Sequence, residues 1–174
     1  MKHLITILEI KHLSRDGRII WQDRNLVNTL HAEGELFILD VLFSGQPLPE
    51  NYYFGLDHRT AITTKDTITS LTGEPNNGYN GYARQPVSSV GQFESGVTIY
   101  GDNMVESPIM YFSAHDGSWG PVKNLFLTNV SQDDDSGYLI SSVPLSSAAT
   151  VNDGESLTLR MGLALRNILM PAST

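Results

Sequence analysis

The sequence has 174 residues, of which 40% are hydrophobic and 17% charged, and a formal net charge of −8. This length fits one domain with a single core. An acidic chain without a basic stripe is unsuited to nucleic acid, and the lack of cysteine excludes disulfides, thiolate nucleophiles and cysteine-based zinc sites. No apolar run approaches the ~18 residues of a membrane span. The low charged share, made up by Ser, Thr, Asn and Gly, is typical of an all-β protein with many loops.

The first predicted element is a β-hairpin. Leu4–Leu13 and Arg18–Asp23 are rich in β-branched residues, and Asp16-Gly17 between them is a strong hairpin signal. The same N-terminal stretch does not read as a secretory signal, because charged residues interrupt its apolar run. We therefore expect the protein to be made and folded in a host cytoplasm.

One long helix is predicted after the hairpin. Asn28 is its expected N-cap, and Ser44-Gly45 followed by Pro47 ends it. Apolar residues recur along it at helical spacing and are so dense in the second half that we expect this half to be buried nearly all round. Gly34, in the middle, predicts either close packing against a strand or a break in the helix. The apolar residues are Leu30, Leu36, Phe37, Ile38, Leu39, Val41, Leu42 and Phe43.

The rest of the chain predicts strands separated by turn-rich loops. Pro86 restricts its strand to a sheet edge or a bulge. Thr64–Leu71 indicates one short helix, and Val97–Tyr100 is compatible with a further strand. The expected strands are Tyr52–Asp57, Tyr82–Val90, Met104–Ala114, Pro121–Asn129, Tyr138–Leu145 and Ser156–Arg166.

This order of elements predicts a mainly β fold. We expect an antiparallel β-sandwich of jelly-roll or Greek-key type, with an N-terminal hairpin and one longer helix. We treat the chain as a single domain, in which residues 1–49 form a hairpin-plus-helix section and residues 50–174 form the sandwich section.

Signs of catalysis or metal binding are sparse. The adjacent pairs Asp57-His58 and His115-Asp116 are not expected to form catalytic dyads alone, because neighbouring side chains on a strand point to opposite faces. Asp133–Asp135 lacks the alternating acidic pattern of a calcium loop and predicts a solvated loop. There is no Gly-x-Ser-x-Gly elbow. The histidines show no metal-ligand spacing. We expect no enzyme activity, no metal and no cofactor. The five histidines are His3, His12, His31, His58 and His115.

Tyrosines are the most distinctive side chains of the sequence. They favour either core and edge packing or an exposed aromatic platform, which could stack on sugars or contact another subunit. The tyrosines considered are Tyr52, Tyr53, Tyr79, Tyr82 and Tyr100. The residues that we expect at an interface are Tyr52, Tyr53, Tyr79, Tyr82, Arg84 and Trp119.

Five short segments, in order between Tyr52 and Leu165, resemble a recurrent pattern in the virion proteins of tailed bacteriophages. The resemblance implies a non-enzymatic structural component of a phage particle, either a capsid decoration (cement) protein or a tail-associated protein. Residues 1–49 lie outside it. The segments are Tyr53-Phe54-Gly55-Leu56, Gly78–Val87, Trp119–Leu127, Leu139–Leu145 and Val151–Leu157.

Three functional hypotheses follow. The first is a trimeric decoration protein on the capsid surface, which bridges subunits of the major capsid protein through many weak contacts. The second is a tail-fibre, baseplate or other tail-associated protein with a glycan-binding face built from the tyrosines. The third is a hydrolase of host surface polymers, for which the sequence offers no positive sign. None of them involves nucleic acid or a membrane as a partner.

Overall fold

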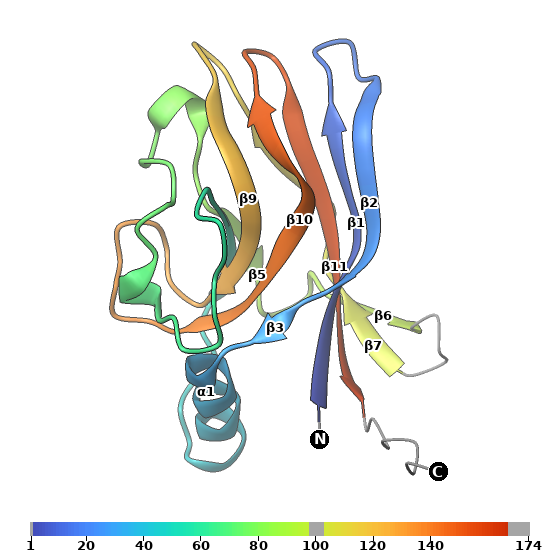
Figure 1. Cartoon of the computed structure of the whole chain (residues 1–174). Helices are drawn as coiled ribbons and strands as arrows, with labels where there is room; N and C mark the ends of the chain where they lie inside the picture. The colour runs from blue at the N-terminus through green and yellow to red at the C-terminus, as the bar shows by residue number, and fades with distance from the viewer. Residues whose placement is uncertain (1, 98–102, 167–174) are drawn as a thin grey trace, which may run out of the picture.

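The protein folds into two antiparallel sheets with one helix at one end (Figure 1). A computed structural model of the chain describes residues 2–97 and 103–166. The sheets confirm the predicted mainly β architecture with an N-terminal hairpin and one helix, while the jelly-roll or Greek-key topology stays a prediction.

Sheet A has the strand order β2-β1-β11-β7-β6, and β8 also pairs with β11. Its hairpin β1–β2 and its central pair β1–β11 are antiparallel over most of their length. Its strand β11 has the bounds that were expected for the final strand of the chain. The strands of sheet A are β1 (Lys2–Leu13), β2 (Ile19–Val27), β6 (Glu94–Val97), β7 (Asn103–Glu106), β8 (Met110–Ser113) and β11 (Ser156–Arg166).

Sheet B has the order β3-β10-β9-β4-β5. Because β1 is central in sheet A and β3 pairs with β10, residues 1–49 contribute to both sheets. The strands of sheet B are β3 (Thr29–Leu30), β4 (Asn51–Asp57), β5 (Gln85–Ser88), β9 (Trp119–Thr128) and β10 (Leu139–Val151).

The helix α1 spans Ala32–Phe43 and starts later than predicted, with His31 and not Asn28 at the N-cap. The reason is tertiary, because Thr29 and Leu30 pair with β10 and are held extended. The expected close packing at Gly34 is confirmed. A Cβ on this residue would lie 2.2 Å from the carbonyl oxygen of Ile140 in β10, so only glycine allows the helix to approach the sheet this closely.

Three further expectations meet a different outcome. Of the expected helix Thr64–Leu71, only a 3₁₀ turn over Ile68–Ser70 forms, with a capping box before it. The expected strand Met104–Ala114 is divided into β7 and β8, on either side of Pro108. The expected strand Val97–Tyr100 lies outside the described residues, apart from Val97 at the end of β6. Pro86 does sit in an edge strand, β5, as predicted.

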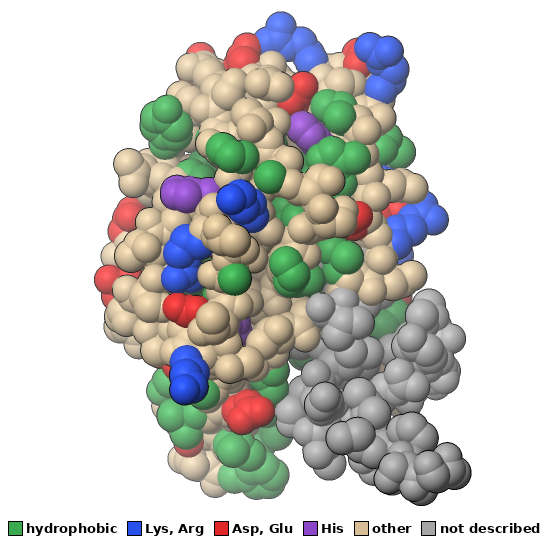
Figure 2. Space-filling model, in the orientation of Figure 1, with side chains coloured by type: hydrophobic (Ala, Val, Ile, Leu, Met, Phe, Trp, Pro, Cys, Tyr) green, Lys and Arg blue, Asp and Glu red, His purple; other side chains and the backbone are tan. Residues whose placement is uncertain are grey.

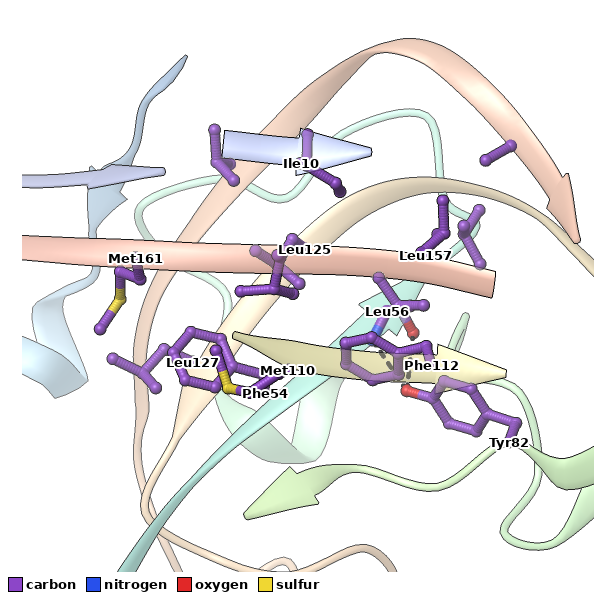
Figure 3. Packing of buried hydrophobic residues seen from close by; sticks show 14 of the residues in the cluster. Ile10, Phe54, Leu56, Tyr82, Met110, Phe112, Leu125, Leu127, Leu157 and Met161 are labelled. Carbon is purple, nitrogen blue, oxygen red and sulfur yellow. Dashed lines mark hydrogen bonds between the residues drawn. The ribbon is translucent and has the colours of Figure 1, made fainter. Parts of the chain in front are cut away.

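The core lies between the two sheets (Figure 3). Alternate residues of β11 enter it from sheet A, and residues of β4 and β9 enter it from sheet B, as expected for a sandwich with two inner faces. Side chains with no more than 1% exposure include Ile10, Phe54, Leu56, Phe112, Leu125, Leu157 and Leu159.

Candidate binding surfaces

Tyr82 and Arg84, two of the residues predicted at an interface, instead converge on Glu74 inside the protein. The Tyr82 hydroxyl donates to Glu74 Oε1 at 2.9 Å and accepts from the N–H of Leu56 at 2.8 Å, which Figure 3 shows in part. The Arg84 guanidinium donates two hydrogen bonds to the same carboxylate, from Nε at 3.0 Å and from Nη2 at 2.8 Å. Burial raises the pKa of Tyr82 well above its ordinary value, so the hydroxyl stays protonated.

The glycine of the Tyr-Phe-Gly-Leu segment belongs to the same structural unit. A Cβ on Gly55 would lie 2.1 Å from Cζ of Phe126, so the ring needs the space that glycine leaves. The Arg84 guanidinium carbon lies 5.3 Å from the centre of this ring, in the range of a cation–π contact. Residues of Tyr53–Leu56 and of Gly78–Val87 therefore serve internal packing in this chain.

Trp119 is also buried, at 2% exposure, and meets the ring of Tyr82 edge-on at 5.7 Å. Tyr52 and Tyr53 are half-buried, and Tyr52 packs edge-on against Phe37. The prediction that Tyr82, Arg84 and Trp119 offer an exposed contact is therefore wrong, because the sequence pattern cannot distinguish a buried aromatic from an exposed one. Tyr100 lies outside the described residues.

Tyr79 is the one of these predicted residues that is largely exposed, at 55%. It follows Gly78, whose φ of 74° turns the chain outward. Its ring borders a groove of about 320 Å³. Trp119 also lines this groove, whereas Tyr52 and Tyr53 do not. We call this the Tyr79 groove. It is lined by His58, Thr72, Glu74, Pro75, Asn76, Tyr79, Trp119 and Gly120.

The outward side of α1 is apolar and exposed. Leu36 and Leu39 are 51% and 54% exposed, Leu42 is 62% exposed and Phe43 is 79% exposed. We call these four residues the α1 outer face; Figure 2 shows hydrophobic side chains gathered at the end of the molecule that α1 occupies. We expected the second half of the helix to be buried nearly all round, and this is wrong for the single chain. Within α1, only Gly34 and Phe37 are fully buried.

The opposite side of α1 packs on the sandwich. Phe37 and Ile38 line an apolar cavity of about 280 Å³ between the helix and the two sheets. Glu33 also points inward, because its carboxylate accepts the backbone N–H groups of Ile68 at 3.0 Å and Leu139 at 2.8 Å. The helix is therefore anchored by its inner side and leaves its apolar outer face to the solvent.

A second exposed apolar surface lies on the outer side of sheet A. Ile19, Ile109 and Tyr111 are 53%, 55% and 56% exposed and line a groove of about 480 Å³, with Lys11 and Arg160 beside them. We call this the sheet A groove. The sequence analysis missed it, although a signal existed. Residues 109–112 are all apolar, whereas a strand with one side in water normally alternates apolar with polar residues.

In residues 2–97 and 103–166, no group of three or more His, Asp or Glu side chains could hold a metal ion. One expectation is corrected, because His115 Nδ1 does reach Asp116 Oδ2, at 3.0 Å. Asp116 has a φ of 63° in the turn after β8, so the pair does not follow the geometry of a strand. Both side chains are well exposed.

The expected loop of three aspartates is tied by local hydrogen bonds. Asp133 accepts from Asn77 at 3.0 Å, and Asp134 accepts from the hydroxyl and the N–H of Ser136.

Among the described residues, no helix combines the length and apolar character needed to cross a bilayer.

No protein-family model matches the sequence. No curated protein matches it either. The functional argument therefore rests on the surfaces described above.

Proposed function

We propose that this protein is a non-enzymatic structural component of a bacteriophage particle, a capsid decoration protein that stabilises the head by bridging capsid subunits. The observation that carries the proposal is the presence of two separate apolar surfaces, the α1 outer face and the sheet A groove. Exposed apolar patches rimmed by polar groups mark sites of protein–protein contact.

The two surfaces lie over different sheets. The α1 helix packs on β10 of sheet B, whereas the groove lies over β1, β2, β8 and β11 of sheet A. A chain of this form can contact two neighbours at the same time. Several weak contacts that act together give high avidity without any single strong site, which suits a protein that clamps a shell.

The test is the position and copy number of the chain in purified particles. Quantitative mass spectrometry gives the ratio to the major capsid protein, and electron microscopy of particles with a labelled chain gives the location. We expect a high, stoichiometric ratio and label on the head. Label at the tail in a few copies, or a chain that is missing from the particle, contradicts the proposal.

A tail-associated protein with a glycan-binding face is the second candidate, and the Tyr79 groove favours it. Sugar-binding sites combine an aromatic ring for stacking with planar polar groups for hydrogen bonding. Tyr79 supplies the ring, and Asn76 and His58 supply polar groups in the same groove.

A glycan array with the purified chain tests this candidate. Tyr79→Ala should abolish binding, because it removes the stacking surface and leaves the fold intact. Tyr111→Ala is the matched control, since Tyr111 is 56% exposed against 55% for Tyr79 but lies in the sheet A groove. Tyr82 is unsuitable for this test because it is buried. Binding that persists in Tyr79→Ala contradicts a glycan site in this groove.

A further inference from the structure

The helix α1 is apolar on both sides, but the chain covers only one of them. Gly34, Phe37, Ile38 and Val41 face the sandwich, at the spacing of one helix stripe. The α1 outer face lies on the other side. A helix that is apolar all round is normally buried all round, so a partner for the outer face is missing from the single chain.

The spacing of the outer residues is that of one helix face, against which a second helix can pack. Ala32, Leu36, Leu39 and Phe43 follow one another at intervals of four, three and four residues, and all four are exposed. This is the a/d spacing of a coiled-coil seam, in which a helix packs against a helix of the same pattern. We define these four residues as the α1 seam.

We propose that the α1 seam binds the same seam on other copies of this chain. A seam with a/d spacing is complementary to itself, so the chain already carries a suitable partner surface. The helices then run parallel around a rotation axis, and the residues at each level meet their own equivalents. The number of three copies rests on the proposed function, because local three-fold sites of a capsid favour a cyclic trimer.

The charges beside the seam oppose this association slightly and give it a signature. Glu35 and Asp40 occupy the g and e positions, which face each other between parallel helices. Glu33 adds no charge at the seam, since its carboxylate accepts backbone N–H groups on the inner side of the helix. Added salt screens like charges at an exposed contact. The oligomer should therefore become more stable, and not less, as ionic strength rises.

The first experiment measures the mass of the purified full chain by sedimentation. We expect three times the chain mass of 19.2 kDa. Leu39→Glu should reduce the mass to that of one chain without loss of the far-UV circular dichroism of a folded β protein. Ile109→Glu is the control, because Ile109 is 55% exposed and Leu39 54%, but on different surfaces. This variant should keep the threefold mass.

The second experiment uses the absence of cysteine from the chain. Leu39→Cys places one thiol per copy in the seam, so mild oxidation should link copies in pairs, whereas Ile109→Cys should not link them. A monomeric or dimeric wild type, an oligomer that Leu39→Glu leaves intact, or linking that is equal in both cysteine variants overturns the inference.

These measurements need no phage particle. If they fail while the chain is found on the capsid, the decoration function stands and the seam is wrong. If they succeed while particles lack the chain, the seam stands and the decoration function is wrong.

Discussion

Glu74 shows at the scale of single residues what holds the Tyr82-Ala83-Arg84 segment in place. The Glu74 carboxylate accepts hydrogen bonds from the Tyr82 hydroxyl and from Nε and Nη2 of Arg84. The side chains of Arg84 and Glu74 are only 5% and 10% exposed. A buried ion pair adds little over an apolar pair of the same shape, but it is very costly to break on one side. The cluster is therefore a structural lock inside the single chain.

Glu74→Gln should destabilise the protein strongly, since the Arg84 charge would stay buried without a counter-ion. We expect a loss of about 3–5 kcal/mol in the free energy of unfolding, measured with urea. Asp16→Asn is the control, because it breaks an ion pair with Arg18 that is largely in water and should change stability very little. If the two substitutions changed the free energy of unfolding equally, the Glu74 cluster would not be the structural lock that we infer.

Gly55→Ala should also destabilise the fold, because the new methyl group overlaps the ring of Phe126. Overpacking of this kind costs about 1–3 kcal/mol. Phe126→Leu in the same chain should recover part of the loss by removing the ring, so the two effects should not add. Thermal unfolding of the two single variants and the double variant checks this, and strict additivity would count against it.

At the scale of elements, α1 shows what sequence patterns predict well and what they miss. The spacing of apolar residues predicted the helix, and Ser44-Gly45 with Pro47 predicted its end. Gly34 left two alternatives open, of which the structure shows the close contact. Its start was missed because the pairing of Thr29 with Ser142, which are 113 positions apart, outweighs the local capping signal of Asn28. The exposure of its outer face was missed, because periodicity says that a face is apolar but not which molecule covers it.

The start of α1 should respond to mild acid. Burial lowers the pKa of His31 from its ordinary value of 6.5, although Asp66 and Glu33 act against this shift. The folded state thus favours the neutral ring, whose Nε2 lies 2.8 Å from the Ser142 hydroxyl. A lowered folded pKa means that this stability is complete above pH 6.5 and is lost as pH falls through the folded value.

Denaturant unfolding at a series of pH values measures this response. His31→Asn removes the titrating ring and places a residue that favours the N-cap position, where His31 makes no side-chain cap hydrogen bond. We expect this variant to be less stable at neutral pH but to have a flatter dependence of the free energy of unfolding on pH below 6.5. Parallel pH profiles for the two proteins would show that His31 contributes nothing to the dependence.

A charge reversal beside the α1 seam should strengthen the proposed oligomer. Glu35→Lys turns the facing pair with Asp40 of a neighbouring copy from repulsive to attractive. We expect the dissociation constant to fall about two- to fivefold at low salt and the gain to shrink at high salt. Glu50→Lys makes the same change of net charge outside the helix and should leave the dissociation constant as it is.

At the scale of the whole molecule, the fold class was predictable and the use of the surface was not. Alternation along β1 and β11 and the turn signals between strands indicate two antiparallel sheets. The candidate site was predicted poorly, because aromatic residues suit a core and an interface equally well. Of the six residues expected at an interface, the fold buries Tyr82, Arg84 and Trp119 and leaves Tyr79 largely exposed.

The two apolar surfaces should have separable roles in a particle. Ile109→Glu should reduce the recovery of the chain with purified capsids, because it places a charge in the sheet A groove, while the mass of the free oligomer stays unchanged. Co-sedimentation of the chain with capsids that lack it measures this. Full recovery of Ile109→Glu with the capsids would show that the groove takes no part in attachment.

The two borders of sheet B limit how copies of this protein can associate. β3 offers only two residues, and β5 offers four, with Pro86 lacking the N–H that a further strand would need. A neighbour therefore finds only short border strands to extend on this sheet. Strand addition is therefore disfavoured at both borders of sheet B, whereas β2, with nine residues, is a longer strand at a border of sheet A.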